Sequence, residues 1–446
     1  MLLGNIYVKH ENNLRVAEYL YKKAYALNPD DPYLLTNLGA LFVEMDKKEI
    51  AQDYFTRAIK IDSSYPKAYY GLALLNANNE HLEDAIHTLE ELFTKPRSDD
   101  KRLWPVYAQA RVLYLDVNKK IVERSYSSLM STLETRKQGI EQETGVHIEI
   151  VEDNSLKSIF AVAESARRHD RDTHIIRYRN IDRRITPHLI AHELEHLYME
   201  EQTRAVGRNR FFATTAQTRE HAIRSVGDYI FQQQKRGHSE SIITEVTLQL
   251  VNGLARQLHS CPLDMMVEYR LYSDLETLHP SQFLSLVYNH TQSLKTITDP
   301  EIRKNSPRQI FQASVALNYA YALFCDSLYP KAANFAEPYR ISKLDSVAHV
   351  LFDTWQQIMQ SYHPGDEYTL VDEFAHVLKL EDWFEWKADT SQQPQPEGPT
   401  NPELLKEQEP ATMMYCLGAL QYFQGMDKEE VFTVGSEIGL LVMSDN

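Results

Sequence analysis

A spacing of 34 residues runs through the first 95 residues and constrains the fold more than any other feature of this sequence. Three sets of apolar positions keep the spacing, and two prolines share it. The sets are Ala17, Ala51 and Ala85; Tyr21, Phe55 and Leu89; and Ala24, Ala58 and Leu92, with Pro32 and Pro66 as the prolines. A small residue lets one helix approach another, and the large residue fills the groove between them. Each block therefore predicts two amphipathic helices packed as a pair.

The pattern is clearest in the segment NLGALFVEMDKKEIAQDYFTRAIKIDSSYP, which resembles the tetratricopeptide repeat family. The resemblance covers about residues 1–95 and implies a stack of helix pairs. Such stacks usually present a concave groove to a peptide or a partner protein. We therefore expect a protein partner in that groove. A purely supporting role inside the chain is the other interpretation.

The composition narrows the class of protein. A chain of 446 residues is too long for one ordinary core, so two or three domains are expected. Its net charge of −16 opposes the attraction of nucleic-acid phosphates. The cysteines favour neither a disulfide framework nor a thiolate metal site, because Cys261, Cys325 and Cys416 form no CxxC pair. With no apolar run of ~18 residues and no signal-like start, the sequence predicts a cytoplasmic protein without membrane contact.

The middle of the chain changes from helical to extended patterning. Residues 101–145 keep a helical period, and Gly145 is typical of a helix C-terminus. A further helix is expected from Thr186 as N-cap and Pro187 in its first turn, and helical patterning continues to about residue 360. Between these regions, three short segments predict strands: residues 147–153, 158–165 and 173–180. The predicted fold class is mainly α, with one small sheet (α+β).

The helix expected after the third strand carries an HExxH motif, His192-Glu193-Leu194-Glu195-His196. Its two histidines are four residues apart, so on a helix their imidazoles share one face and can reach a single Zn²⁺ ion. Glu193 is offset by one residue and would face the water molecule that the metal activates. The motif therefore predicts two metal ligands and a general base on one helical turn. Two surface histidines on a charged helix are the other interpretation.

With a strand before it and apolar flanks around it, this stretch resembles the zincin superfamily of metallopeptidases over about residues 120–275. The resemblance implies a short twisted sheet, then the HExxH helix, then a helix carrying a third ligand. It also implies that His192 and His196 bind Zn²⁺ and that Glu193 is the catalytic base. The residues after His196 lack the HExxHxxGxxH extension of the metzincins, so a glutamate ligand is favoured.

The candidate third ligand is Glu268, which lies 72 residues after His196 on a helix expected to begin near Pro262. Asp264 lies one turn earlier on the same face. In the glutamate-ligand zincins that this stretch resembles, a carboxylate one turn from the ligand commonly orients a histidine. There the order is Glu then Asp, whereas here it is reversed. Asp264 is therefore expected either to orient a histidine or to cap the helix.

Other residues remain alternatives for the third ligand. Glu200 continues the face of His196, although three ligands along one helix rarely converge on one ion. Glu220 and His221 form a second possible pair, and His188 is expected to be a polar residue of the same stripe. Candidate donors to a developing oxyanion surround the predicted ligand: Tyr269, Tyr272, Arg270 and His259.

Two further features concern substrates. The segment 158–165 is a candidate edge strand that could pair with an extended peptide, as the resemblance to zincins implies. Seven arginines precede the motif and would favour acidic substrates or an acidic partner if they formed a positive rim, whereas a solvated face is the other interpretation. They are Arg167, Arg168, Arg171, Arg177, Arg179, Arg183 and Arg184.

Together these features predict a zinc-dependent metallopeptidase in which Glu193 is the general base and the repeats dock a protein substrate or regulator. A non-catalytic adaptor with a structural or vestigial metal site is one alternative, and a hydrolase of non-peptide bonds is another. The predicted segments are repeats at 1–98, a zincin-like domain at 99–290, a helical extension at 291–388, a flexible linker at 389–410 and a helical hairpin at 411–446.

Overall fold

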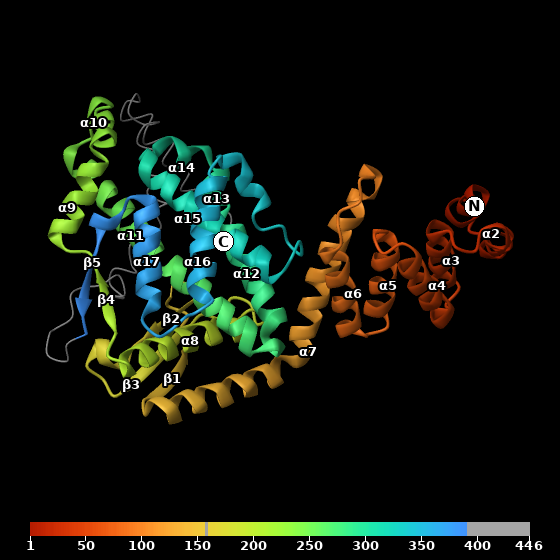
Figure 1. Cartoon of the computed structure of the whole chain (residues 1–446), viewed down its shortest axis with the longest axis horizontal. Coiled ribbons are helices and arrows are strands. Elements are labelled where there is room, and N and C mark those ends of the chain that lie inside the picture. Colours follow the sequence, from red (N-terminus) through yellow and green to blue (C-terminus); the bar gives the residue numbers. More distant parts are fainter. Residues whose placement is uncertain (157–158, 390–446) are drawn as a thin grey trace, which may run out of the picture.

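The structure is a computed structural model that describes residues 1–156 and 159–389, and it shows an arm of helices projecting from a larger body (Figure 1). The arm confirms the predicted helix pairs, because successive helices pack on one another in the expected order. The pairs are α1 (Leu2–Lys9) with α2 (Leu14–Leu27), α3 (Pro32–Glu44) with α4 (Lys48–Ile61), and α5 (Pro66–Asn78) with α6 (Leu82–Thr94).

Local chemistry explains where the repeat helices begin. The Asp31 carboxylate caps α3 by accepting hydrogen bonds from the backbone N–H of Tyr33 at 2.9 Å and of Leu34 at 3.3 Å. Pro32 and Pro66 occupy the first turns of α3 and α5, where a missing N–H costs nothing. The small residues of the repeat are buried between the helices, as the pattern predicted: Ala17, Ala51 and Ala85.

One long helix joins the arm to the body. This helix, α7 (Trp104–Thr144), has 41 residues, packs on α5 and α6 near its start and reaches α8 and β1 near its end (Figure 1). It ends at Gly145, whose φ of 72° lies in the left-handed region that an L-residue rarely adopts. The predicted helix end is therefore confirmed.

A small mixed sheet follows α7. Its strands are β1 (His147–Glu152), β2 (Ala161–Glu164) and β3 (Thr173–Tyr178), in the order β1-β3-β2. β1 runs parallel to β3, with Ile148 opposite His174, and β2 runs antiparallel to β3. The three predicted strands are confirmed, and β2 lies at an edge of the sheet. Helix α8 (Thr186–Ala205) packs against β2 and β3.

The remainder of the body is helical, as predicted, with one difference. A second sheet of two antiparallel strands joins β4 (Arg210–Ala213) to β5 (Glu385–Ala388). The sequence interpretation missed it, because each strand has only four residues and its partner is remote in sequence. The helices are α9 (Ala216–Ser225), α10 (Gly227–Lys235), α11 (Glu240–Asp274), α12 (His279–Ser293), α13 (Lys295–Thr298), α14 (Pro300–Asn305), α15 (Arg308–Leu328), α16 (Asp345–Met359) and α17 (Asp366–Leu378).

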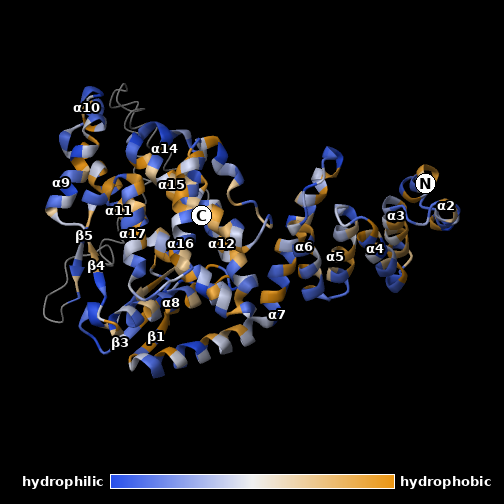
Figure 2. Cartoon of the chain, in the orientation of Figure 1, coloured by the Kyte–Doolittle hydropathy of each residue, from blue (hydrophilic) through white to orange (hydrophobic). Residues whose placement is uncertain are grey.

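A single hydrophobic cluster runs from the third repeat into the body. Leu89 and Phe93 of α6 belong to the same cluster as Leu194 of α8 and Met265 of α11. Figure 2 shows hydrophobic and hydrophilic residues interleaved along the helices of both parts, as expected for helices that each bury one face. The boundary predicted between residues 98 and 99 stays a prediction, and packing is continuous across it. The predicted hairpin and the predicted linker beyond residue 389 lie outside the described residues.

None of the described helices combines the length and the apolar character needed to cross a membrane. The longest, α7, carries charged residues along its whole length. The longest helix inside the body, α11, likewise mixes apolar and charged residues.

The close packing of Phe55 in the repeat stack can be tested by mutation. The Phe55 ring lies between two glycines, and a Cβ atom added to Gly71 would come within 2.5 Å of that ring. Because the ring is buried and cannot swing away, Gly71→Ala is expected to lower the free energy of unfolding by about 1–3 kcal/mol. Urea denaturation of the full chain measures the change.

Gly139→Ala is the matched control, because Gly139 is also helical but has open space where a Cβ atom would stand. This change is expected to be neutral or to raise stability by up to about 1 kcal/mol through helix propensity. Equal stability changes at the two glycines would contradict the packing described for Phe55.

Candidate metal centre

The HExxH residues lie in the middle of α8, whose start differs from the prediction by one position. Thr186 is the first helical residue and Ile185 occupies the cap position, so the prediction of Thr186 as N-cap is wrong. The Thr186 hydroxyl instead donates to the backbone carbonyl of Asp182 at 3.1 Å, which is a bond within the turn. Pro187 stands in the first turn, as predicted.

The facing helix α11 is longer than predicted. It runs without interruption from Glu240 to Asp274 and passes through Pro262, so the prediction that a helix begins near Pro262 is wrong. A proline removes one backbone hydrogen bond, and the burial of Pro262 and Cys261 in the core outweighs that loss here. Asp264 therefore lies inside the helix and does not cap it.

Three donor atoms from these two helices converge. The Nε2 atoms of His192 and His196 are 3.0 Å apart. The Asp264 Oδ1 atom lies 3.1 Å from Nε2 of His196 and 3.6 Å from Nε2 of His192. A tetrahedral Zn²⁺ ion with ligands at ~2.0–2.1 Å separates its donor atoms by about 3.3 Å. The spacing of this His-His-Asp group therefore fits the ion.

Glu268 lies on the other side of the His192 ring. Its Oε1 atom is 2.9 Å from Nδ1 of His192, and its Oε2 atom is 2.8 Å from Nε2 of His188. The structure therefore brings Glu268 to His192 but not to His196. These contacts form a second group of three possible ligand residues, His188, His192 and Glu268. The assignment of Glu268 as third ligand stays a prediction.

The electrostatics of the two carboxylates suit a positively charged neighbour. Burial would raise the pKa of Asp264, but its contacts with His192 and His196 outweigh burial and lower that pKa. Burial would also raise the pKa of Glu268, and His188 and His192 outweigh it more strongly. Both carboxyl groups are thus held ionised, which is the form that binds a cation or accepts a histidine proton.

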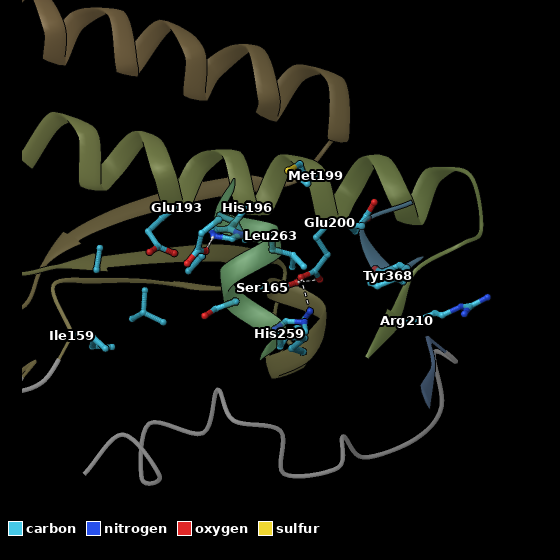
Figure 3. Close-up of a pocket in the computed structure, with 18 of the residues that line it drawn as sticks. Ile159, Ser165, Glu193, His196, Met199, Glu200, Arg210, His259, Leu263 and Tyr368 are labelled. Atoms are coloured by element: carbon cyan, nitrogen blue, oxygen red, sulfur yellow. Dashed lines mark hydrogen bonds and ion pairs between the residues drawn. The ribbon is translucent and has the colours of Figure 1, made fainter. Parts of the chain in front are cut away.

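A cavity of about 280 Å³ opens beside the converging donors. Figure 3 shows Glu193 and His196 projecting from α8 toward this cavity, across from Ser165 and His259. Asp264 lines the same cavity, as does the edge strand β2 through Ala161 and its neighbours. Among the described residues that line it, neither His188 nor Glu268 is present. His192 is not among the lining residues either, so the His192–His196–Asp264 group reaches the cavity, which also contains Glu193, through His196 and Asp264.

Glu195, the second variable residue of the motif, fixes the position of α8. Its buried carboxylate receives the Arg270 Nε–H at 2.6 Å and an Arg136 Nη2–H at 2.9 Å. Arg136 belongs to α7 and Arg270 to α11, so one carboxylate ties three helices together. Ion pairs of this kind are costly to break singly, because the remaining charges stay partly buried.

The other residues considered as ligands occupy different places. Glu220 and His221 are exposed on α9 and belong to neither ligand group found among the described residues. Glu200 lies farther along the cavity, where it accepts from the Ser165 hydroxyl at 2.7 Å. It also pairs with Arg168 at 3.0 Å and with Arg204 at 2.6 Å.

Among the candidate oxyanion donors, only His259 lines the cavity. Its pKa is lowered to about 3, mainly by burial and then by the nearby Arg168, so the ring is neutral near pH 7. Arg270 binds Glu195, Tyr269 packs its ring on Trp355, and Tyr272 stacks on His279. The structure therefore separates these three side chains from the cavity.

Most arginines of the predicted positive rim have acidic or aromatic partners. Arg171 and Arg177 both bind Glu164, each at 2.8 Å, and Arg183 lies over the ring of Tyr126. Arg184 likewise pairs with Asp182. These contacts favour the interpretation of a structural, solvated face over that of a free cationic rim.

Two contacts at the candidate site were missed by sequence reasoning. Gln282 donates to Glu268 Oε2 at 2.6 Å, and nothing in its surroundings in the sequence signals this role. His188 is a buried partner of Glu268 and not a polar face residue as predicted. The spacing of His188, His192 and His196, each one turn after the last, was the available signal.

Comparison with known families supports the arm alone. Residues 32–65 match the family model described as tetratricopeptide repeat. These residues form α3 and α4, which are the second helix pair of the arm. Neither the comparison with curated proteins nor the comparison with solved structures gave a match. Tetratricopeptide repeats generally mediate contacts between proteins.

The ion pairs of Glu200 predict a specific dependence of stability on pH. Burial would raise the pKa of Glu200, but Arg168, Arg204 and the Ser165 hydroxyl outweigh it and lower that pKa to about 2. Folding lowers the pKa of Glu200, so its ionised carboxylate stabilises the folded state fully at pH values above the ordinary pKa of 4.5. This contribution to the free energy of unfolding is lost as the pH falls toward about 2. Glu200→Gln is expected to cost roughly 3 kcal/mol near neutral pH.

Urea denaturation at several pH values checks this. Wild type should lose more stability than Glu200→Gln on acidification from about pH 5. Glu149→Gln, a change on the exposed part of β1, is the control and should follow the wild-type profile. Parallel profiles for wild type and Glu200→Gln would contradict the assignment.

Proposed function

We propose that this protein is a zinc-dependent metallopeptidase whose repeat arm docks a protein substrate or regulator. The observation that carries the proposal is the convergence of His192 Nε2, His196 Nε2 and Asp264 Oδ1 beside a cavity that also contains Glu193. Two imidazoles and one carboxylate are a donor set that Zn²⁺ commonly takes, and three protein ligands leave one position open. We assign the third ligand to Asp264 in place of Glu268.

We assign a different step of peptide hydrolysis to each of the groups around the cavity. When bound, a Zn²⁺ ion would polarise the scissile carbonyl and lower the pKa of water. The Glu193 carboxylate has the position and the acceptor capacity to take a proton from the attacking water and to return it to the leaving amine. His259, neutral and on the cavity wall, is the candidate donor to the developing oxyanion.

The edge strand that lines the cavity favours a peptide as substrate. β2 is an edge strand, and it lines the cavity next to Glu193 and His196. An extended peptide can satisfy the free backbone groups of such an edge by pairing as an additional strand. A small non-peptide substrate would have no use for this edge. A panel of peptide and non-peptide esters and amides separates the two classes of hydrolase.

The central test combines metal content with activity. Glu193→Gln is expected to keep about one zinc per chain and to lose about 10²–10⁴-fold in peptide cleavage, because the base is removed and the ligands stay. His192→Ala and Asp264→Asn are expected to lose the zinc. Inductively coupled plasma mass spectrometry and cleavage of a peptide library provide the two measurements.

Glu220→Gln, on the exposed face of α9, is the control and should change neither quantity. Two outcomes would overturn the proposal. The first is a wild-type protein that contains no zinc even after zinc has been supplied, and the second is full peptide cleavage by Glu193→Gln. The first outcome would favour the adaptor interpretation, because the repeat match is independent of the metal.

The docking role of the arm can be tested by truncation. The third repeat shares its core with the body, so a deletion should stop before α5 and remove residues 1–62 only. This variant is expected to cleave short peptides at the wild-type rate and to bind or cleave its protein substrate more weakly, because part of the concave surface is gone. Pull-down from a lysate followed by cleavage assays on the captured proteins gives the comparison. Equal loss of both activities would indicate a supporting role for the repeats.

A further inference from the structure

We propose that Glu268 is a positioning residue that holds the His192 imidazole by its Nδ1 atom and so directs Nε2 toward the metal position. This inference rests on the proposed function, because positioning matters only if His192 is a ligand. It assigns to Glu268 a role different from the one that its sequence position suggests. It also gives His188 and Gln282, which do not line the cavity, a function in the same site.

The contact with His192 sets the direction of its ring. An ionised carboxylate can only accept hydrogen bonds, so Glu268 Oε1 at 2.9 Å requires the proton of His192 to stand on Nδ1. In the neutral ring the lone pair is then on Nε2, which is the atom that lies 3.0 Å from His196 Nε2. Glu268 thus selects the tautomer that can bind a metal on the cavity side.

The second oxygen of Glu268 is held by two donors. Oε2 accepts from His188 Nε2 at 2.8 Å and from Gln282 Nε2 at 2.6 Å. Gln282 is itself fixed, because its Oε1 atom accepts from the Tyr329 hydroxyl at 2.8 Å. The Nδ1 atom of His188 is buried without a partner among the described residues, so Glu268 is the polar partner of that ring.

Burial keeps this group of side chains in place. His188 is 1% exposed, Gln282 is fully buried and Glu268 is 2% exposed. Turning the Glu268 side chain toward the cavity would leave the buried His188 Nε2 without its acceptor and Gln282 with only the Glu268 backbone carbonyl, at 2.9 Å. Burial and these hydrogen bonds therefore favour a Glu268 side chain that contacts the ligand His192 and does not itself occupy a ligand position.

The geometry of the two helices explains the exchange of roles between the carboxylates. α8 and α11 face each other so that His192 meets Glu268 and His196 meets Asp264. The shorter Asp264 side chain places its Oδ1 atom within 3.1 Å of Nε2 of His196 and within 3.6 Å of Nε2 of His192. The longer Glu268 side chain reaches past them to Nδ1 of His192 and to His188. Asp264, which comes first along the chain, is therefore the ligand, and Glu268, which comes one turn later, is the positioning residue.

The test measures metal affinity of the full chain by competition with a chromogenic chelator. Glu268→Met keeps the volume and removes both acceptors, and it is expected to weaken Zn²⁺ binding by about 10–100-fold. Glu268→Gln keeps one acceptor oxygen and should recover part of the loss. With Co²⁺ in place of Zn²⁺, both variants should retain the wild-type visible spectrum, because the ligand set is unchanged, whereas Asp264→Asn should alter or abolish it.

Three results would overturn the proposal. Loss of binding in Glu268→Gln as complete as in His192→Ala would make Glu268 a ligand. A changed Co²⁺ spectrum in Glu268→Met would do the same. Unchanged affinity in Glu268→Met, with only lower thermal stability, would leave Glu268 a purely structural role. Asp326→Asn is the control for the last case, because Asp326 also accepts buried backbone N–H groups, from Phe335 and Ala336, away from this site.

A metal-independent measurement separates failure of this inference from failure of the proposed function. Crystal structures of metal-free wild type and of Glu268→Met are expected to differ in the His192 ring, which should rotate or occupy two positions in the variant. An unchanged ring would overturn the positioning role whether or not zinc binds. Wild type that binds no zinc would overturn the metallopeptidase proposal, and the ring comparison would still decide whether Glu268 positions His192.

Discussion

The pairing of three histidines on α8 with two carboxylates on α11 is the interaction on which the rest of the structure depends. Both carboxylates are held ionised, Glu268 in the interior and Asp264 half-buried beside the cavity, and hydrogen-bond donors at fixed places make this tolerable. The histidines supply those donors one helical turn apart, and Glu195 binds arginines of α7 and α11 from the same helix. Polar contacts therefore fix how far α8 can slide or rotate against its neighbours. Apolar packing alone tolerates such shifts more readily.

The features that follow a local period could be predicted from the sequence. The repeat helices are indicated by apolar positions 34 residues apart, and the three strands by short alternating or apolar segments. Both signals depend only on residues that are near one another along the chain. The same holds for the placement of His192 and His196 on one helical face, since a separation of four residues is enough to establish it. Glu193 follows from the same argument and lines the cavity with His196.

The features that depend on how remote segments meet could not be predicted. Sequence placed Asp264 and Glu268 one turn apart but could not say which one would reach the Nε2 atoms, because that depends on the offset between α8 and α11. The continuity of α11 through Pro262 depends on burial, which outweighs the local cost of proline. The pairing of β4 with β5 joins segments separated by most of the body, and four residues carry too little signal for it.

The continuity of α7 determines what the arm can do for the site. A helix of 41 residues is about 60 Å long, and this one packs on the repeats at one end and supplies Arg136 to Glu195 near the other. Tyr114, in the first third of the helix, contacts Glu90 of the arm and Phe283 of the body. A protein docked in the repeats, as we propose, would consequently be held in one direction relative to the cavity, and not on a flexible linker. Under the proposed function, such an arrangement would select substrates by where their cleavable segment lies relative to the docked part, which short-range contacts in the cavity alone could not do.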